Sequence, residues 1–270
     1  MKKVFMVLLF LLMLLSFSCE MGIAPPEKGS ATERSSVSES MYYPLHLLSN
    51  WWGWGELTQS SYLSPGTVIV VRPGTSWSLD KGTTAENMVK NNQVRTIVMA
   101  GVGSSSRGTA AMAKLIANSL NQPVAGIVTG WGDYSTTSTG MEGYFVGRPN
   151  NEAGTYYDNV ASAKLVALYN AGARPVRVIG HSKGAMDSAN AFFRMNQLNR
   201  NSQLNQTKFI TFGMGVFVPS GLNSFVQYIG GSDSLGQHNM VNDNPMIVVP
   251  GRGHSLNPAM SMHVPVTGRL

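Results

Sequence analysis

The fold of this chain is decided by one stretch of its sequence, VRVIGHSKGAM at residues 176–186. The stretch begins as an apolar strand, passes through a G-x-S-x-G pentad at residues 180–184, and continues into an Ala-rich helix. So tight a turn between strand and helix holds Ser182 in a strained backbone conformation and projects its hydroxyl clear of the sheet. Glycine is needed at Gly180 and Gly184, because a side chain there would collide with the neighbouring strand or helix. The pattern makes Ser182 a candidate nucleophile.

The rest of the sequence alternates short apolar runs with stretches of helical periodicity. The runs predict strands at Thr67–Val71, Arg95–Ala100, Val124–Val128, Pro175–Ile179, Phe209–Phe212, Phe225–Ile229 and Met246–Val249. The periodic stretches predict helices at Thr109–Leu120, Tyr156–Tyr169 and Lys183–Phe193. This alternation predicts an α/β fold in which helices cover both faces of a mostly parallel sheet. Ligands bind beyond the carboxyl ends of such strands, so the residues that directly follow each strand are the catalytic candidates.

From about residue 67 to 256 the chain resembles the α/β-hydrolase fold, a three-layer sandwich. Within that fold it resembles the lipase-like enzymes in which the tight turn around the nucleophile, called the elbow and here residues 180–184, has the sequence Gly-His-Ser-x-Gly. The TFG at residues 211–213 is similar to the Thr-Phe-Gly that follows the next strand in class 3 lipases. The resemblance implies a catalytic triad in the chain order serine, acid, histidine. The residues at strand ends in that order are Ser182, Asp233 and His254.

The acid has alternatives that the residues leave open. Asp233 lies in a Gly-Gly-Ser-Asp loop, where aspartate is also a common turn residue or helix cap. Asp187 on the helix after the elbow and Asp243 in a polar loop remain candidates. Asp133 is most simply a polar loop residue.

Two histidines are the main candidates for the catalytic base. His254 follows a predicted strand by a few residues, after two glycines that let the backbone turn sharply toward the elbow. His263 stays open, because the family often places a helix after its catalytic histidine and few residues remain here. The other histidines fit less well: His181 is inside the elbow as a packed neighbour, His46 precedes the sheet, and His238 lies in a loop.

An oxyanion hole needs two backbone N–H donors. One is expected from Lys183, directly after the nucleophile. The resemblance places the other in the loop after the strand that ends at Ala100, where Val102 is our choice and Gly103 the alternative. The long polar loop from residue 130 to 154 is expected to line or cover the acyl pocket, although it lacks the pattern of an amphipathic lid helix.

The N-terminus predicts a lipoprotein leader. Lys2 and Lys3 precede an apolar run, Val4–Leu15, which is shorter than the roughly 20 residues of a spanning helix. Cys19 follows a sequence that resembles a relaxed bacterial lipobox, with Ser16 at the position where leucine is usual. We therefore expect a signal peptide at residues 1–19, lipidation of Cys19, a flexible tether at 20–41, and one domain at 42–270 in the cell envelope outside the cytoplasm.

The composition narrows the function further. The 13% of charged residues is too low for a disordered chain, and the net charge of +6 is spread without the basic run that nucleic acid requires. With one cysteine, neither an internal disulfide nor a cysteine metal cluster can form. We expect a lipid-anchored serine hydrolase of carboxylic esters, particularly lipid esters, with no metal or organic cofactor. The alternatives are a thioesterase or peptidase with the same triad, and a non-catalytic binding or adhesion lipoprotein on this fold.

Overall fold

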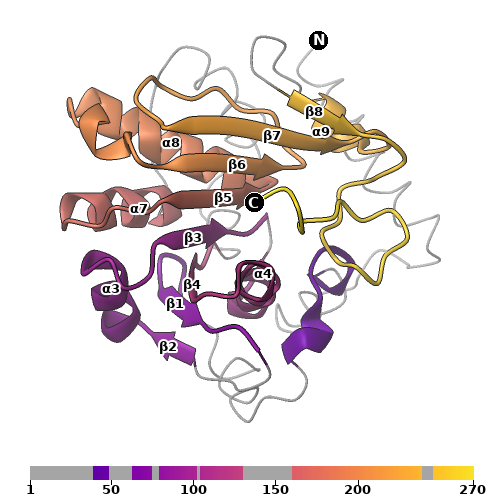
Figure 1. The fold of residues 1–270 in the computed structure, drawn as a ribbon, viewed down its shortest axis with the longest axis horizontal. Helices are drawn as coiled ribbons and strands as arrows, with labels where there is room; N and C mark the ends of the chain where they lie inside the picture. The colour runs from indigo at the N-terminus through magenta and orange to yellow at the C-terminus, as the bar shows by residue number, and fades with distance from the viewer. Residues whose placement is uncertain (1–38, 49–62, 75–78, 102–103, 130–159, 239–245) are drawn as a thin grey trace, which may run out of the picture. The chain divides into compact units, whose positions relative to one another are not determined.

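The computed structural model describes residues 39–48, 63–74, 79–101, 104–129, 160–238 and 246–270, all within one compact unit, Val37–Leu270 (Figure 1). The expected leader, Cys19 and most of the expected tether lie outside the described residues. The last residues of that tether, 39–41, are described, and Glu39 is only 3% exposed. The packed part of the chain therefore begins ahead of the expected boundary at residue 42.

In the described ranges the chain forms an eight-stranded sheet with the strand order β2-β1-β4-β3-β5-β6-β7-β8. The strands are β1 (Val68–Val71), β2 (Leu79–Lys81), β3 (Thr96–Met99), β4 (Val124–Ile127), β5 (Arg177–His181), β6 (Lys208–Phe212), β7 (Ser224–Gly230) and β8 (Met246–Val249). β1 runs antiparallel to both of its neighbours, and every other neighbouring pair is parallel. The mostly parallel α/β fold is thus confirmed.

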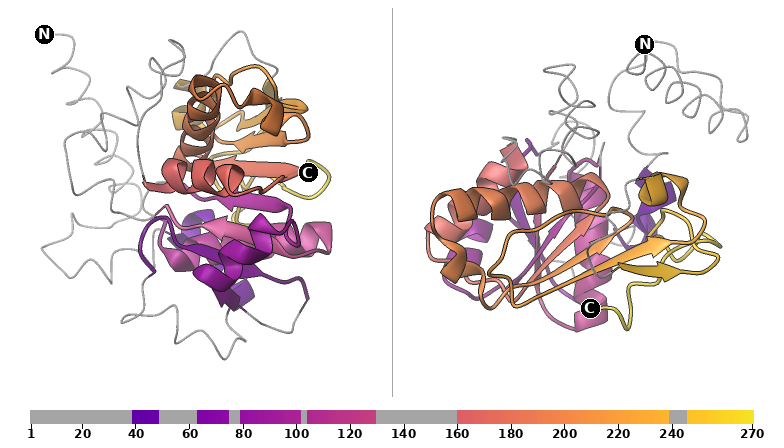
Figure 2. Two further views of the ribbon diagram at one scale, coloured as in Figure 1. Left: turned by 90° about the vertical axis from the view of Figure 1, so that its left-hand side faces the viewer. Right: turned by 90° about the horizontal axis from the view of Figure 1, so that it is seen from above.

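Helices cover both faces of this sheet (Figure 2). They are α3 (Thr83–Lys90), α4 (Ser106–Leu120), α7 (Val160–Asn170), α8 (Lys183–Gln197) and the short α9 (Ser234–His238), with 3-10 turns η1 (Leu45–Leu48) and η3 (Asn201–Leu204). None of the described helices is long and apolar enough to cross a membrane.

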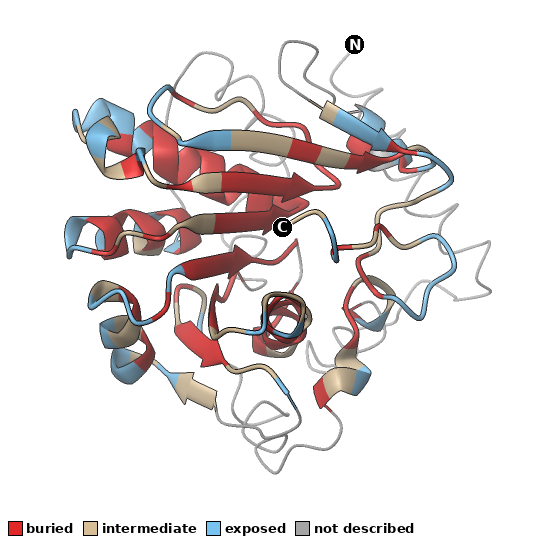
Figure 3. Cartoon of the chain, in the orientation of Figure 1, coloured by how far each residue is buried: buried red, intermediate tan, exposed pale blue. Residues whose placement is uncertain are grey.

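Alternate residues of each central strand pack into two separate cores, because successive side chains of a strand point to opposite faces. In β1, Val68 and Val70 belong to the core under α3, α7 and α8. Ile69 and Val71 belong to the core under α4 and η1. Figure 3 shows β1, β3 and β5 almost wholly buried between these layers. Strands buried on both faces explain the continuous apolar runs seen in the sequence.

The second core is completed by the C-terminal segment instead of a helix. Residues 250–270 form neither helix nor strand, yet Leu256, Val264 and Val266 are buried in the core that contains α4. This segment packs over β6 and β7, where Arg269 lies 5.6 Å from the centroid of the Tyr228 ring.

The chain changes direction in the sheet between β3 and β5. From β3 it moves through α4 to β4 on one side, and then returns past β3 to β5 on the other. Ligand sites in open α/β sheets lie at such a switch point, beyond the carboxyl ends of the strands. Gly101 after β3 and Ser182 after β5 are the residues found there.

The predicted strands and helices are all present, with shifted ends. α4 begins at Ser106, ahead of the predicted Thr109, because Ser105 caps it: the Ser105 hydroxyl accepts a hydrogen bond from the Arg107 N–H at 3.1 Å. α8 continues to Gln197, and the start of the helix predicted at Tyr156 lies outside the described residues. β2 and α3 were not predicted from the sequence.

Candidate active site

The elbow has the strained geometry expected from its sequence. Ser182 has φ 52° and ψ −126°, a conformation that non-glycine residues rarely adopt. A Cβ on Gly180 would lie 2.3 Å from the Ala185 Cα, and one on Gly184 would lie 2.1 Å from the Met99 carbonyl oxygen. Both glycines are therefore required where β5, α8 and the end of β3 pack together. The strain at Ser182 is maintained because this packing fixes both sides of the turn.

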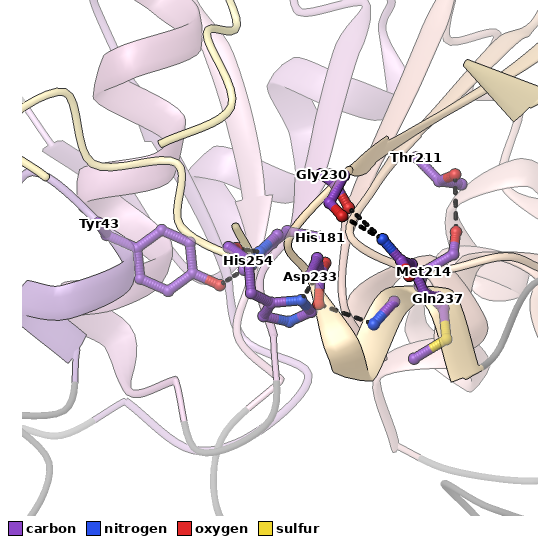
Figure 4. Close-up of polar contacts among 10 residues, drawn as sticks. Tyr43, His181, Thr211, Met214, Gly230, Asp233, Gln237 and His254 are labelled. Atoms are coloured by element: carbon purple, nitrogen blue, oxygen red, sulfur yellow. Dashed lines mark hydrogen bonds and ion pairs between the residues drawn. The ribbon is translucent and has the colours of Figure 1, made fainter. Parts of the chain in front are cut away.

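Asp233 and His254 are brought together by the ends of β7 and β8 (Figure 4). The His254 Nδ1 lies 2.7 Å from the Asp233 Oδ2, and the Asp233 side chain is 1% exposed. The other carboxylate oxygen, Oδ1, accepts a hydrogen bond from the Gly236 N–H at 2.7 Å. Asp233 is thus a helix cap for α9 and a partner of His254 at the same time. The carboxylate holds the imidazole with Nδ1 protonated, which leaves the lone pair on Nε2.

Gly213 lies directly against the Asp233–His254 pair. It has φ +67°, and a Cβ built on it would lie 2.8 Å from the His254 ring and 3.3 Å from the Asp233 Oδ2. It is the glycine of the TFG at residues 211–213, and its N–H donates to the Tyr228 carbonyl at 2.8 Å. The motif quoted for its resemblance to lipases therefore supplies a glycine that leaves room for the imidazole.

His181 and Tyr43 connect the elbow to the residues around it. The Tyr43 Oη is 2.7 Å from the His181 Nδ1 and accepts a hydrogen bond from the Gly101 N–H at 2.6 Å. The His181 Nε2 donates to the His254 carbonyl at 2.8 Å. The His181 and His254 rings lie 4.9 Å apart between centroids. The candidate base is therefore beside the elbow, although Ser182 and His254 share no hydrogen bond in this structure.

Burial sets the protonation of both side chains. Desolvation, with the nearby His254, lowers the pKa of His181 to about 3, so its imidazole is neutral at any ordinary pH. Burial likewise raises the pKa of Tyr43, so its hydroxyl keeps its proton. The expectation that His181 is a packed, hydrogen-bonded neighbour of the nucleophile agrees with this geometry.

The loop that carries His254 is held by the N-terminal segment. The Ser255 hydroxyl donates to the Met41 carbonyl at 2.6 Å, and the Leu256 N–H donates to the Tyr42 carbonyl at 3.0 Å. The ring of Tyr42 stands edge-on to that of His254 with centroids 5.9 Å apart. Residues 41 and 42, expected at the end of the tether and the start of the domain, therefore contact the loop that carries the candidate base.

The other candidates are placed as follows. Asp187 forms a buried ion pair with Lys183, 2.8 Å from Nζ to Oδ2, and so belongs to the first turns of α8. The His263 Nδ1 donates to the Met260 carbonyl of its own loop at 2.8 Å. His46 lies in η1 and His238 ends α9. Val102, Gly103, Asp133, Asp243 and the loop at 130–154 lie outside the described residues.

Tyr43 was not predicted as a site residue from the sequence. It precedes the sheet in a stretch without periodicity, and its partners are distant in the chain, so no local signal marks it. Gly213 was noted only as part of the TFG motif that is similar to that of class 3 lipases. In the ranges that the structure covers, no group of three or more His, Cys, Asp or Glu side chains could hold a metal ion.

The comparisons with known proteins find a likeness among solved structures alone. No protein-family model and no curated protein matches the chain. Among solved structures, a dienelactone hydrolase-like promiscuous phosphotriesterase from metagenomic libraries is similar at a TM-score of 0.35 and 15% identity, over 64% of this chain and 76% of that one. The functional conclusion accordingly comes from the geometry of the site.

Proposed function

We propose that this protein is a serine hydrolase that cleaves carboxylic esters through an acyl-enzyme. The observation that carries the proposal is the Asp233–His254 pair, 2.7 Å apart, beside an elbow that holds Ser182 at φ 52°. A nucleophile on a strained turn, a histidine next to it and a buried carboxylate that fixes the histidine tautomer are the parts that this chemistry requires.

The reaction follows from the roles of these groups. The Nε2 of His254 takes the proton of the Ser182 hydroxyl as its oxygen attacks the ester carbonyl. Asp233 stabilises the imidazolium that forms. The oxyanion is bound by the N–H of Lys183 and that of Val102, each donor contributing about 3 kcal/mol to transition-state stabilisation. The imidazolium then protonates the leaving alcohol, and His254 activates a water molecule that releases the acid and restores Ser182.

The substrate class is a finer part of the same proposal. Lipid esters are favoured by the resemblance of the elbow and of the TFG at residues 211–213 to lipases. A lipid anchor at Cys19 would place the enzyme on a membrane of the cell envelope, next to such esters. A Cys19→Ala variant should then yield protein without attached lipid, as measured by mass spectrometry of the membrane fraction. A lipid-bearing product from that variant would contradict the lipobox.

The test of the activity is labelling with a fluorophosphonate, which reacts with activated serines, together with hydrolysis of a panel of p-nitrophenyl esters. Ser182→Ala should remove labelling and lower kcat by about 10⁴–10⁶-fold while the circular dichroism spectrum is unchanged. Ser188→Ala is the matched control, because Ser188 is buried on α8 and its hydroxyl donates to the Gly184 carbonyl at 2.8 Å. Full hydrolysis by the Ser182 variant would overturn the proposal, and an unlabelled, inactive wild type would favour a binding lipoprotein.

A further inference from the structure

The Tyr43 hydroxyl joins the two strand ends of the switch point. It accepts the Gly101 N–H at 2.6 Å at the end of β3 and is 2.7 Å from the Nδ1 of His181 at the end of β5. Since the His181 Nε2 donates to a carbonyl, its neutral ring carries the lone pair on Nδ1, and the Tyr43 hydroxyl must be the donor to it. One hydroxyl is therefore acceptor and donor at once, and its direction is fixed.

These hydrogen bonds end at the segment that follows β3 and at the loop that carries His254. Gly101 directly precedes Val102, the residue chosen as an oxyanion donor. At the other end, the His181 Nε2 bonds to the backbone carbonyl of His254 itself at 2.8 Å. The hydrogen bonds Gly101–Tyr43–His181–His254 thus link the end of β3, the elbow and the loop that carries His254 (Figure 4 shows the Tyr43–His181 part).

The surroundings keep solvent away from these hydrogen bonds. Tyr43 and His181 are each 1% exposed, so water cannot replace a lost partner. A Cβ on Gly101 would lie 3.1 Å from both the Ser182 Cβ and the Tyr43 Oη. The elbow, the end of β3 and the tyrosine are consequently packed in direct contact, and a shift of one moves the others.

We propose that Tyr43 and His181 are positioning residues that hold the oxyanion-side strand end and the His254 loop at a fixed separation around Ser182. The inference rests on the proposed serine hydrolase activity and adds a role for the segment that precedes the sheet. Misplacement of reacting groups by about 1 Å can cost on the order of 100-fold in rate. Loss of these hydrogen bonds should therefore lower kcat and leave substrate binding nearly unchanged.

The experiment uses the full chain with Tyr43→Phe, His181→Leu and His181→Gln. Tyr169→Phe is the matched control, because Tyr169 is also 1% exposed and its hydroxyl is 2.8 Å from that of Thr207, between α7 and β6. Active sites are counted by fluorophosphonate labelling carried to completion, so that kcat for p-nitrophenyl butyrate refers to folded enzyme alone.

Tyr43→Phe and His181→Leu should lower kcat per active site by about 10–100-fold with KM within about threefold. His181→Gln keeps an N–H donor for the His254 carbonyl and should recover much of that loss. Tyr169→Phe should lower the melting temperature with kcat within about twofold of wild type. Tyr43→Phe with the kcat of Tyr169→Phe would overturn the inference and leave the proposed function standing.

A second readout does not need activity. The Nδ1 proton of His254, held by Asp233, should give a downfield proton resonance in the wild type and in Tyr169→Phe. In Tyr43→Phe the same resonance should shift or exchange faster with solvent, because the His254 backbone is no longer held. An unchanged resonance and exchange rate in Tyr43→Phe would contradict the positioning role even if the wild type hydrolysed no ester.

Discussion

At the scale of single residues, the choice of base separates His254 from His263. The His254 Nδ1 is 2.7 Å from a buried carboxylate, whereas the His263 Nδ1 bonds to the Met260 carbonyl. His254→Ala should therefore lower kcat about as much as Ser182→Ala, and the double variant should lose little more, because triad members act as a unit. His263→Ala should cost less than about tenfold. An essential His263 with a dispensable His254 would refute the assignment in the same ester assay.

Gly213 gives a second prediction at this scale. In Gly213→Ala the new methyl group would meet the His254 ring at 2.8 Å, so the imidazole must move away from its position beside Asp233. We expect kcat to fall by about 10–100-fold with KM little changed. Gly268→Ala is the control: Gly268 also has a positive φ, +80°, but nothing lies within 4 Å of its Cβ position.

Both glycine variants should lose about 1–2 kcal/mol of stability from the left-handed backbone, measured by urea denaturation. Only the first should lose activity. Equal kcat values for Gly213→Ala and Gly268→Ala would mean that the contact with His254 does not set its position.

At the scale of elements, Glu39 joins the N-terminal segment to α4. Its carboxylate accepts hydrogen bonds from the Ser105 N–H and, at 3.0 Å, from the Ser105 hydroxyl. Burial outweighs these bonds and raises the pKa of Glu39 from its usual 4.5 to about 7. Between these pH values the folded chain therefore holds the Glu39 proton more tightly than the unfolded chain does.

The contribution of Glu39 to stability is therefore complete below about pH 4.5 and is lost as pH rises through 7, by about 3 kcal/mol. Glu39→Gln should flatten the fall in the free energy of unfolding between pH 5 and 8, measured by urea titration at each pH. Glu86→Gln is a control of opposite sign: burial opposes ionisation, but hydrogen bonds from Lys164 and Lys90 lower the pKa of Glu86. An equally steep fall in Glu39→Gln would disprove this role.

Some of the strands and helices could be predicted from the sequence, and others could not. β3, β4, β5 and β6 were predictable because each is an apolar run buried on both faces. β2 was not, since Leu79–Lys81 has no buried residue and is defined only by its pairing with β1. In α3, Ala85, Met88 and Val89 do have helical spacing and face one core, but the helix has only eight residues, too few for this spacing to stand out. The antiparallel direction of β1 leaves no trace in composition, because a strand buried on both faces reads the same in either direction.

The residues of the candidate site likewise include some that could be predicted from the sequence and some that could not. Ser182 was marked by local sequence, and Asp233 and His254 by their places after strands in the order of the resemblance. Glu39 and Tyr43 could not be found, because their partners Ser105 and His181 come from distant parts of the chain. A segment rich in serine and glutamate reads as solvated tether until the fold supplies its partners.

At the scale of the whole molecule, the question is where the folded domain begins. The N-terminal segment bonds to three parts of the fold: Glu39 to the start of α4, Tyr43 to the elbow, and residues 40–42 to the loop after His254. A chain that starts at residue 20 keeps all these contacts without the leader or Cys19. A chain that starts at residue 46 loses them and leaves the Gly101 N–H and the His181 Nδ1 without their partner.

We therefore expect the chain from residue 20 to fold, with hydrolysis of soluble short-chain esters equal to that of the full protein. The chain from residue 46 should melt at least about 5 °C lower, since each buried polar group left unpaired costs about 1–3 kcal/mol. Its kcat per labelled active site should fall at least as far as that of Tyr43→Phe, because the same hydrogen-bonded chain is broken. Differential scanning calorimetry and the ester assay measure the two effects separately. If the shorter chain kept both the melting temperature and kcat, residues 39–45 would be a tether, and the folded domain would begin after residue 45.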